Sequence, residues 1–353
     1  MERTRKVEPL SAQMIRKVNR PQIKQKEYDG DFGIVISTGS TLLDLAISGG
    51  RVRGGGLPGG ILVEAFGPSG SGKTVFLSEI AGAVARQGGN IMFHDPEARL
   101  NRQFAQLFGL DMDEITYTQP DTVTEVFTSI RAWKPEEETK KKNKGINGIF
   151  TDSLAALSTD MEMEKKDGDK MGMRRAKEFS EELRKTCRII AEKNLLMVCS
   201  NQVRVNVDPM SYQKYTTPGG ESVGFYSSLR LRFNKPEKLT NELTIHGKKV
   251  KKVYGVDVVI EVFKSSIWKP HETAPVTIIF DYGIDDIRQN LQYIKDYTKN
   301  TTYTINSRSL GNAMDEAIKK IESEGLEMEL KDQVINLWEA IQRKFAQPRK
   351  PKR

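Results

Sequence analysis

The residues best suited to chemistry lie in the stretch Gly67–Thr74, which reads Gly-Pro-Ser-Gly-Ser-Gly-Lys-Thr. It fits the pattern Gly-x4-Gly-Lys-[Ser/Thr], in which backbone N–H groups surround the phosphates of a nucleotide. In that arrangement Lys73 reaches the β- and γ-phosphates, and the hydroxyl of Thr74 holds Mg²⁺. Residues 61–66 predict a buried strand before the loop, and residues 75–86 predict a helix whose N-terminus points at the phosphates. The pattern therefore predicts a nucleoside triphosphate site.

Three further polar residues follow predicted buried strands, namely Glu97, Asp152 and Gln202. In open α/β sheets ligands bind at the carboxyl ends of the strands, so these side chains should meet at the phosphate-binding loop. There Asp152 would orient Mg²⁺ and its waters, and Glu97 is a candidate general base for water. Gln202 would detect the γ-phosphate. Each residue taken alone fits a loop-end cap equally well, but their order after the phosphate-binding loop favours a hydrolytic site.

Composition is that of an ordered protein without a membrane span. The 353 residues carry a formal net charge of +8, with 37% hydrophobic and 29% charged residues. No apolar run reaches the roughly 18 residues that a transmembrane helix needs, and no apolar signal core follows the basic N-terminus. Cys187 and Cys199 lie among apolar neighbours without metal-ligand spacing, which predicts core thiols in a reducing, cytoplasmic compartment.

The order of predicted elements indicates an α/β fold. Strands alternate with helices through the first two hundred residues, which predicts a mostly parallel central sheet covered on both faces. The clean alternation over residues 254–262 predicts later, antiparallel strands. We expect an N-terminal basic arm with one amphipathic helix (1–33), an ATPase core (34–284), and a small α-rich C-terminal domain ending in a basic tail (285–353). The arm would dock on its own domain or on a neighbouring subunit.

Two polar loops, residues 162–172 and 203–218, combine basic residues with Met and Tyr. This composition suits single-stranded DNA, because cations pair with phosphates while bases stack on apolar and aromatic side chains. Two solvated surface loops would have a similar composition. The residues predicted to contact DNA are Met171, Gly172, Met173, Arg174, Arg175, Arg204, Met210, Tyr212, Lys214, Tyr215, Gly219 and Gly220.

Together these motifs resemble the RecA family of DNA recombinases, over about Ser37–Gly283. The matching segments, in chain order, are Ser37–Ser40, Gly67–Thr74, Asp95–Glu97, Gln119–Thr122, Asp152–Leu157, Met171–Gly172, Ser200–Arg204 and Thr216–Gly220. Colinear motifs at near-family spacing are far more specific than the phosphate-binding loop alone. The divergence outside them resembles a phage- or plasmid-borne member, which would place the protein in the host cytoplasm.

The resemblance implies an ATP- and Mg²⁺-dependent helical filament of identical subunits on single-stranded DNA, which pairs that strand with a homologous duplex. Single-strand-binding or loader proteins are candidate partners. By position, Glu97 matches the hydrolytic glutamate, Asp152 the Mg²⁺-orienting aspartate and Gln202 the γ-phosphate sensor. Phe104 matches the aromatic residue that stacks on adenine, with Asn101 beside it, and Phe225 matches a subunit-interface phenylalanine. The implied nucleotide-binding residues are Gly67, Pro68, Ser69, Gly70, Ser71, Gly72, Lys73, Thr74, Asn101 and Phe104.

One departure from the family concerns catalysis. The family uses two lysines, two residues apart, that reach the ATP of the adjacent subunit. Lys264 matches the first, whereas the second position is Ser266. A cation that acts in trans on the γ-phosphate contributes ~10³–10⁵ in rate. Lys269 or Arg230 would then substitute, or hydrolysis would be slower.

Two other functions stay open from sequence alone. One is a DNA translocase or helicase built on the same fold, although the arm and the two loops match recombinases. The other is an ATP-binding, DNA-binding regulator with little hydrolysis. The presence of both Glu97 and Asp152 argues against it, while Ser266 keeps it open.

Overall fold

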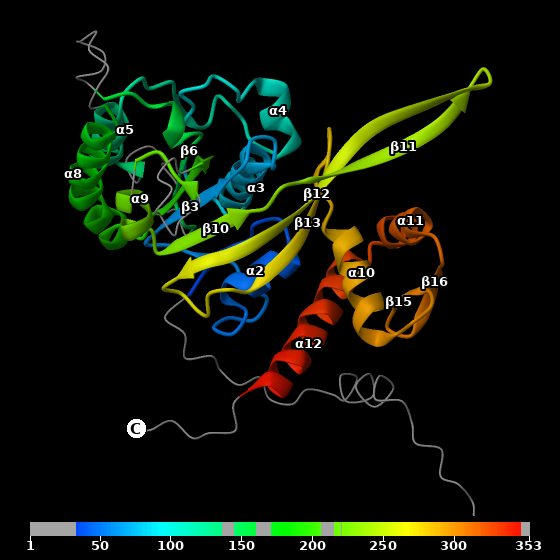
Figure 1. Cartoon of the computed structure of the whole chain (residues 1–353). Helices are drawn as coiled ribbons and strands as arrows, with labels where there is room; N and C mark the ends of the chain where they lie inside the picture. Colours follow the sequence, from blue (N-terminus) through cyan, green and yellow to red (C-terminus); the bar gives the residue numbers. More distant parts are fainter. Residues whose placement is uncertain (1–32, 136–144, 160–170, 206–214, 220, 347–353) are drawn as a thin grey trace, which may run out of the picture.

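The computed structural model describes residues 33–135, 145–159, 171–205, 215–219 and 221–346 (Figure 1). The predicted N-terminal arm (apart from Gly33), the C-terminal tail, and the greater part of both predicted DNA-binding loops lie outside these residues. The predicted domain boundaries therefore stay predictions.

A mixed sheet organises the described part of the chain, in which ten strands run in the order β14-β13-β12-β10-β3-β7-β6-β4-β5, with β11 paired to β12. The strands from β10 to β5 are parallel, which confirms the predicted α/β fold. Their bounds are β3 Ile61–Gly67, β4 Ile91–His94, β5 Thr116–Thr118, β6 Gly148–Thr151, β7 Leu196–Gln202 and β10 Leu229–Phe233.

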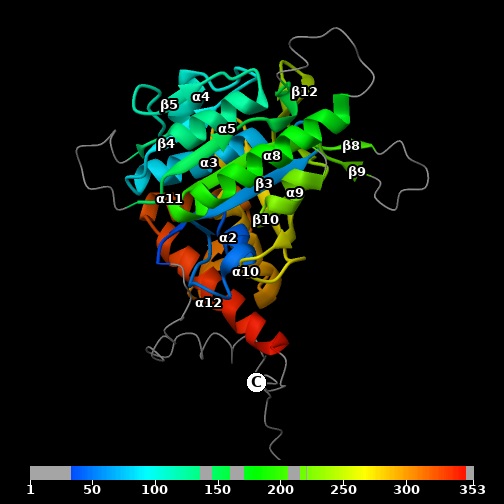
Figure 2. The same cartoon turned by 90° about the vertical axis from the view of Figure 1, so that its left-hand side faces the viewer.

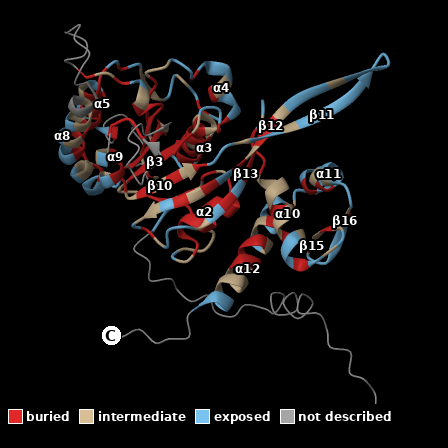
Figure 3. Cartoon of the chain, viewed as in Figure 1, coloured by how far each residue is buried: buried red, intermediate tan, exposed pale blue. Residues whose placement is uncertain are grey.

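Helices cover both faces of the parallel strands, because successive strand residues point to opposite sides. Val63 and Ala65 of β3 pack in a cluster with Phe76 and Leu77 of α3 (Lys73–Arg86). Leu62, directly before Val63, belongs to a second cluster built on helices α5, α8 and α9. These helices span α5 Val123–Ala132, α8 Met171–Glu192 and α9 Glu221–Tyr226, and Figure 2 shows them on one side of the sheet. The two buried layers appear in red in Figure 3.

The later strands add to the sheet in antiparallel fashion, as the alternation over residues 254–262 predicts. They are β11 Glu237–Ile245, β12 Lys248–Ser265, β13 Thr273–Ile279 and β14 Gly283–Ile284. The outer parts of β11 and β12 project from the body as a long exposed hairpin (Figures 1 and 3). The inner part of β12 pairs with both β10 and β13, so β12 joins the parallel and antiparallel halves.

The C-terminal elements pack beside β13 and α2 (Thr41–Ser48). They are α10 Asp286–Thr298, β15 Tyr303–Ile305, β16 Arg308–Gly311, α11 Met314–Glu324 and α12 Glu327–Phe345. The helices follow the predicted apolar spacing, but the β15–β16 hairpin was not predicted. Its strands are three and four residues long, too short for a period of two to be recognised.

A glycine-rich segment and the end of one predicted DNA-binding loop contain regular structure. The segment 49–60 includes β2 (Leu57–Pro58), which pairs with β1 (Val35–Ile36). Residues 171 and 172, predicted to end a polar loop, instead belong to α8, which begins at Met171. The loop prediction for these two residues was wrong because the apolar spacing that marks α8 starts only at Ala176, and Met171 and Gly172 lie before it.

Candidate active site

The register of the parallel strands brings the predicted site residues together at one edge of the sheet. Gly67, at the end of β3, lies opposite Gln202, at the end of β7. Thr151 of β6 pairs with both Cys199 of β7 and His94 of β4, so the residues that follow these three strands are neighbours. The adjacency predicted for the phosphate-binding loop, Glu97, Asp152 and Gln202 is therefore present in the fold.

These strand ends open into a pocket of about 440 Å³. The phosphate-binding loop lines one side, and Gly72 in it has a left-handed φ of 86°. This φ favours glycine, and a Cβ at Gly72 would also lie 2.1 Å from Cδ1 of Ile278, which would have to move. Lys73 is 9% exposed, and its Nζ donates to the carbonyl oxygens of Gly67 at 3.1 Å and Pro68 at 2.7 Å. The loop therefore holds its cation at the pocket wall.

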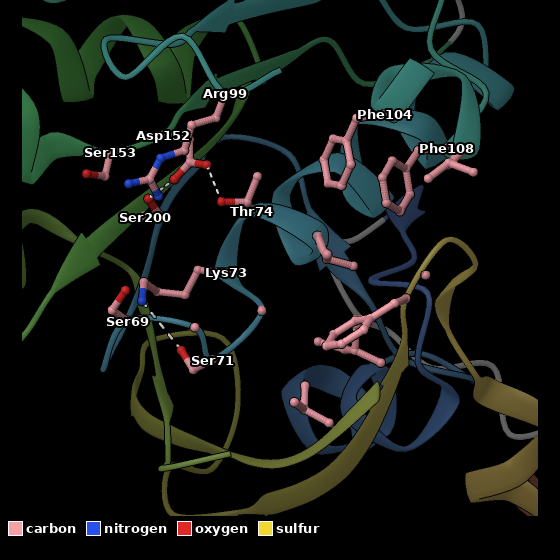
Figure 4. A pocket seen from close by; sticks show the side chains of 18 of the residues that line it. Ser69, Ser71, Lys73, Thr74, Arg99, Phe104, Phe108, Asp152, Ser153 and Ser200 are labelled. Atoms are coloured by element: carbon pink, nitrogen blue, oxygen red, sulfur yellow. Dashed lines mark hydrogen bonds between the residues drawn. The ribbon is translucent and has the colours of Figure 1, made fainter. Parts of the chain in front are cut away.

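A metal-binding arrangement lies beside Lys73. The Thr74 hydroxyl donates to Oδ2 of Asp152 at 2.6 Å, and the Ser200 hydroxyl donates to Oδ1 (Figure 4). Burial raises the pKa of Asp152, and the two hydroxyl donors oppose that shift. A hydroxyl and a carboxylate are the hard oxygen ligands that Mg²⁺ prefers, so the residues present fit this ion. Bound there, Mg²⁺ would neutralise charge on the β- and γ-phosphates.

Glu97 lies next to this pair and has two partners. Ser153 Oγ donates to its Oε1 at 2.8 Å, and Nη2 of Arg99 forms an ion pair with its Oε2. Both Glu97 and Arg99 line the pocket. Arg99 was not predicted from the sequence. The usable signal was its position two residues after Glu97, because the turn at Ala98 lets the two side chains form their ion pair.

The opposite side of the pocket is apolar and aromatic. Phe104 and Phe108 have ring centroids 5.1 Å apart, and Figure 4 shows both rings facing the pocket across from Lys73 and Asp152. Leu107, Phe280 and Tyr282 complete this surface. Asn101 is used differently from its prediction, because its Oδ1 accepts from the N–H of Phe104 at 2.9 Å and caps α4 (Arg102–Leu107). Among the described residues it caps the helix that carries Phe104 and does not line the pocket.

The charge on Lys73 should make nucleotide binding depend on pH. Burial, together with the nearby Arg99, lowers the pKa of Lys73 to about 8, although Asp152 and Glu97 oppose the shift. Only the protonated amine attracts phosphate. We therefore expect the Kd for a fluorescent ATP analogue to rise about tenfold between about pH 7 and about pH 9. The Lys73→Arg variant should bind more weakly but without this loss, because arginine stays protonated. Equal pH profiles for the two proteins would exclude Lys73 as the titrating group.

Comparisons with known proteins agree with this geometry. A family model for the RecA N-terminal domain matches residues 23–285. Protein RecA of Delftia acidovorans is 29% identical over 307 residues, covering 85% of this chain and 78% of that protein. Protein RecA of Thermus thermophilus is 33% identical over 256 residues, covering 72% of this chain and 69% of that protein. Protein RecA of Borrelia hermsii is 30% identical over 293 residues, covering 82% and 77%. The chain belongs to the RecA family.

Membership makes it a RecA-family recombination protein, from a family that binds ATP and DNA. Within the residues described, no helix is both long enough and apolar enough to cross a membrane.

The residues predicted to act between RecA-family subunits lie away from the pocket. Lys264 of β12 donates to the carbonyl oxygens of Gly224 at 2.8 Å and Phe225 at 2.9 Å, near the end of α9. Phe225 is 75% exposed, so a large apolar side chain faces solvent there. Lys269 is exposed, with its Nζ 5.2 Å from the ring centroid of Trp268.

Arg230, named as one substitute for the lysine absent at Ser266, is not free for that role. Its Nε donates to Oε2 of Glu64 at 2.6 Å, and Glu64 is fully buried. The guanidinium also stacks over the rings of Phe66 and Phe263, at 4.5 and 5.4 Å from their centroids. Removing Arg230 from Glu64 would leave a buried charge unpaired, which argues against this alternative.

The predicted DNA-binding residues are only partly described. Met171–Arg175 form the first turn of α8, and Arg204 and Tyr215 belong to β8 (Arg204–Val205) and β9 (Tyr215–Thr216), which pair with each other. Gly219 is buried with a φ of 89°, and the carbonyl oxygen of Pro218 before it accepts from Nδ2 of Asn201 at 3.0 Å. Met210, Tyr212, Lys214 and Gly220 lie outside the described residues. This hydrogen bond connects the end of the loop to Asn201 of β7, the residue directly before Gln202.

Proposed function

We propose that this chain is a DNA-dependent ATPase that forms a helical filament of identical subunits on single-stranded DNA and exchanges that strand with a homologous duplex. One observation carries the proposal: Lys73, the Thr74–Asp152 pair, Glu97 and Gln202 converge on a single pocket. ATP fits this pocket, with its phosphates along the phosphate-binding loop and its base against Phe104.

Hydrolysis would proceed by in-line attack of water on the γ-phosphorus. Glu97 takes a proton from the water as its oxygen bonds to phosphorus, and the bond from phosphorus to the β–γ bridging oxygen breaks to leave ADP and phosphate. Lys73 would bind the β- and γ-phosphate oxygens, and Thr74 and Asp152 would hold the Mg²⁺ whose charge offsets that of the phosphates. Gln202 contacts the γ-phosphate and thereby reports its presence to the loop that ends at Pro218.

Assembly would complete the site. We assign Phe225 to the contact between subunits, and Lys264 and Lys269 to the surface that faces the ATP of the neighbour. Support comes from the exposure of Phe225 and from its position directly beside the Lys264 ammonium. The N-terminal arm, residues 1–33, would dock on the neighbouring subunit, and the two polar loops would bind DNA.

The decisive experiment measures ATP hydrolysis with and without single-stranded DNA, followed by strand exchange between homologous molecules. We expect at least a tenfold stimulation by DNA, and exchange that requires ATP and Mg²⁺. A non-homologous duplex is the control and should give no exchange. Vigorous unwinding of a duplex would favour the translocase alternative. DNA binding without stimulation or exchange would favour the regulator.

A further inference from the structure

Arg99 is a second positive charge in the pocket, in addition to Lys73. It lies in the short connection between β4 and α4 and lines the pocket together with the phosphate-binding loop (Figure 4). Figure 4 shows its side chain beside Asp152, on the same side of the pocket as Lys73. That region is where the γ-phosphate would lie.

The backbone around Arg99 is held in place by Asp95. The Asp95 carboxylate accepts from the N–H of Leu100 at 2.7 Å and from the hydroxyl of Tyr117 at 2.9 Å. The N–H of Ala98 donates to the carbonyl oxygen of Asp95 at 3.1 Å, and Ala98 has a left-handed φ of 51°. This turn supports Glu97 and Arg99 from one side, which is the local rigidity that a catalytic group needs.

Arg99 also has capacity for a ligand. It contacts Glu97 through Nη2, whereas a guanidinium carries five N–H donors in a planar fork suited to phosphate. The side chain is 54% exposed, against 17% for Glu97, so solvent and substrate reach it. Within the part of the chain that the structure describes, the ion pair with Glu97 occupies Nη2 and leaves the other N–H donors of Arg99 available.

A cation from the same subunit would add to Lys264 and Lys269, the two lysines assigned to the subunit interface. Ser266 stands where a second lysine would act in trans, and Arg230 is committed to the buried Glu64. We propose that Arg99 is a catalytic residue that binds the γ-phosphate oxygens within its own subunit and stabilises their charge as the phosphoryl group is transferred. The inference deepens the proposed ATPase function and rests on it.

The proposed role follows from the charge of the transition state. The transferred group carries negative charge on three equatorial oxygens, and an arginine placed there in cis or in trans stabilises it. Glu97 accepts the proton of the attacking water beside it. Arg99 would thus act on phosphate while its contact with Glu97 orients the base.

The test compares Arg99→Ala, Arg99→Lys and the control Arg102→Ala. Arg102 is a good match because it is three residues away, exposed, and paired with Asp113 outside the pocket. We expect Arg99→Ala to lower kcat for DNA-stimulated hydrolysis about 100-fold, the effect typical of losing one transition-state donor. Arg99→Lys should recover part of the lost kcat, and Arg102→Ala should have the kcat of the parent protein. The Kd for ADP, unchanged in all three, shows that the variants are folded.

A second comparison separates a direct role from one exerted through Glu97. If Arg99 binds phosphate, Arg99→Ala should weaken binding of ADP with aluminium fluoride, a transferred-phosphate mimic, but not of ADP alone. It should also lower kcat further in a Glu97→Gln background. The proposal would be overturned if Arg99→Ala lowered neither the affinity for ADP with aluminium fluoride nor kcat in the Glu97→Gln background. Arg99 would then act only by orienting Glu97. If the parent does not hydrolyse ATP, the proposed function fails, but the mimic still decides on Arg99 because it needs no turnover.

Discussion

Replacing Glu97 with glutamine should almost abolish ATP hydrolysis while leaving ATP binding intact. Glutamine keeps an oxygen that can accept from Ser153 Oγ, now at 2.8 Å from Glu97, but it cannot take a proton from water. General bases contribute about 10²–10⁴ in rate, so we expect kcat to fall by that factor. Steady-state hydrolysis on single-stranded DNA measures the loss, and titration with a fluorescent ATP analogue measures affinity.

The control for this variant is Glu114→Gln, which removes the same charge from an exposed position outside the pocket. It should keep the parental kcat. We also propose that hydrolysis releases the protein from DNA, so the Glu97→Gln protein should stay on single-stranded DNA longer after ATP is diluted. A Glu97→Gln enzyme with kcat within threefold of the parent would remove Glu97 from the base role.

Replacing Arg230 with leucine should cause a large loss of stability. Arg230 is the charged partner of Glu64, which is fully buried and also accepts from Nδ2 of Asn201 at 2.9 Å. Removing one partner of a buried ion pair costs about 3–5 kcal/mol, because the remaining charge has no compensation. Urea unfolding followed by circular dichroism should show this as a lower midpoint with an unchanged slope.

Arg232→Leu is the matched control, since Arg232 lies two residues along the same strand and pairs with Glu261 of β12. Its side chain is 44% exposed, so we expect a loss below about 1 kcal/mol. The double variant Glu64→Leu with Arg230→Leu should recover much of the stability, because no buried charge is left. Equal losses for Arg230→Leu and Arg232→Leu would show that burial of Glu64 is not the cause.

Much of the fold and of the candidate site could be predicted from the sequence, for local reasons. The phosphate-binding loop is a contiguous motif. It is preceded by the apolar run of β3 and followed by α3, whose apolar residues recur at helical spacing. Glu97, Asp152 and Gln202 each follow a buried apolar strand, and parallel strands place their carboxyl ends at one edge of the sheet. The meeting of these side chains in one pocket thus follows from pattern and topology together. Their chemical roles are still proposals.

Other features depend on contacts between distant segments, which no local pattern records. The burial of Arg230 needs Glu64 of β3, Phe66 beside it and Phe263 of β12, brought together by strand pairing. The pocket position of Arg99 needs the turn that Asp95 and Tyr117 hold.

The sequence by itself therefore determined that Glu97, Asp152 and Gln202 meet at the phosphate-binding loop, because those residues are attached to recognisable strands. Only the tertiary structure decided which cations can serve that site. Arginines look alike in a sequence, but burial commits Arg230 to Glu64 and leaves Arg99 open to the pocket.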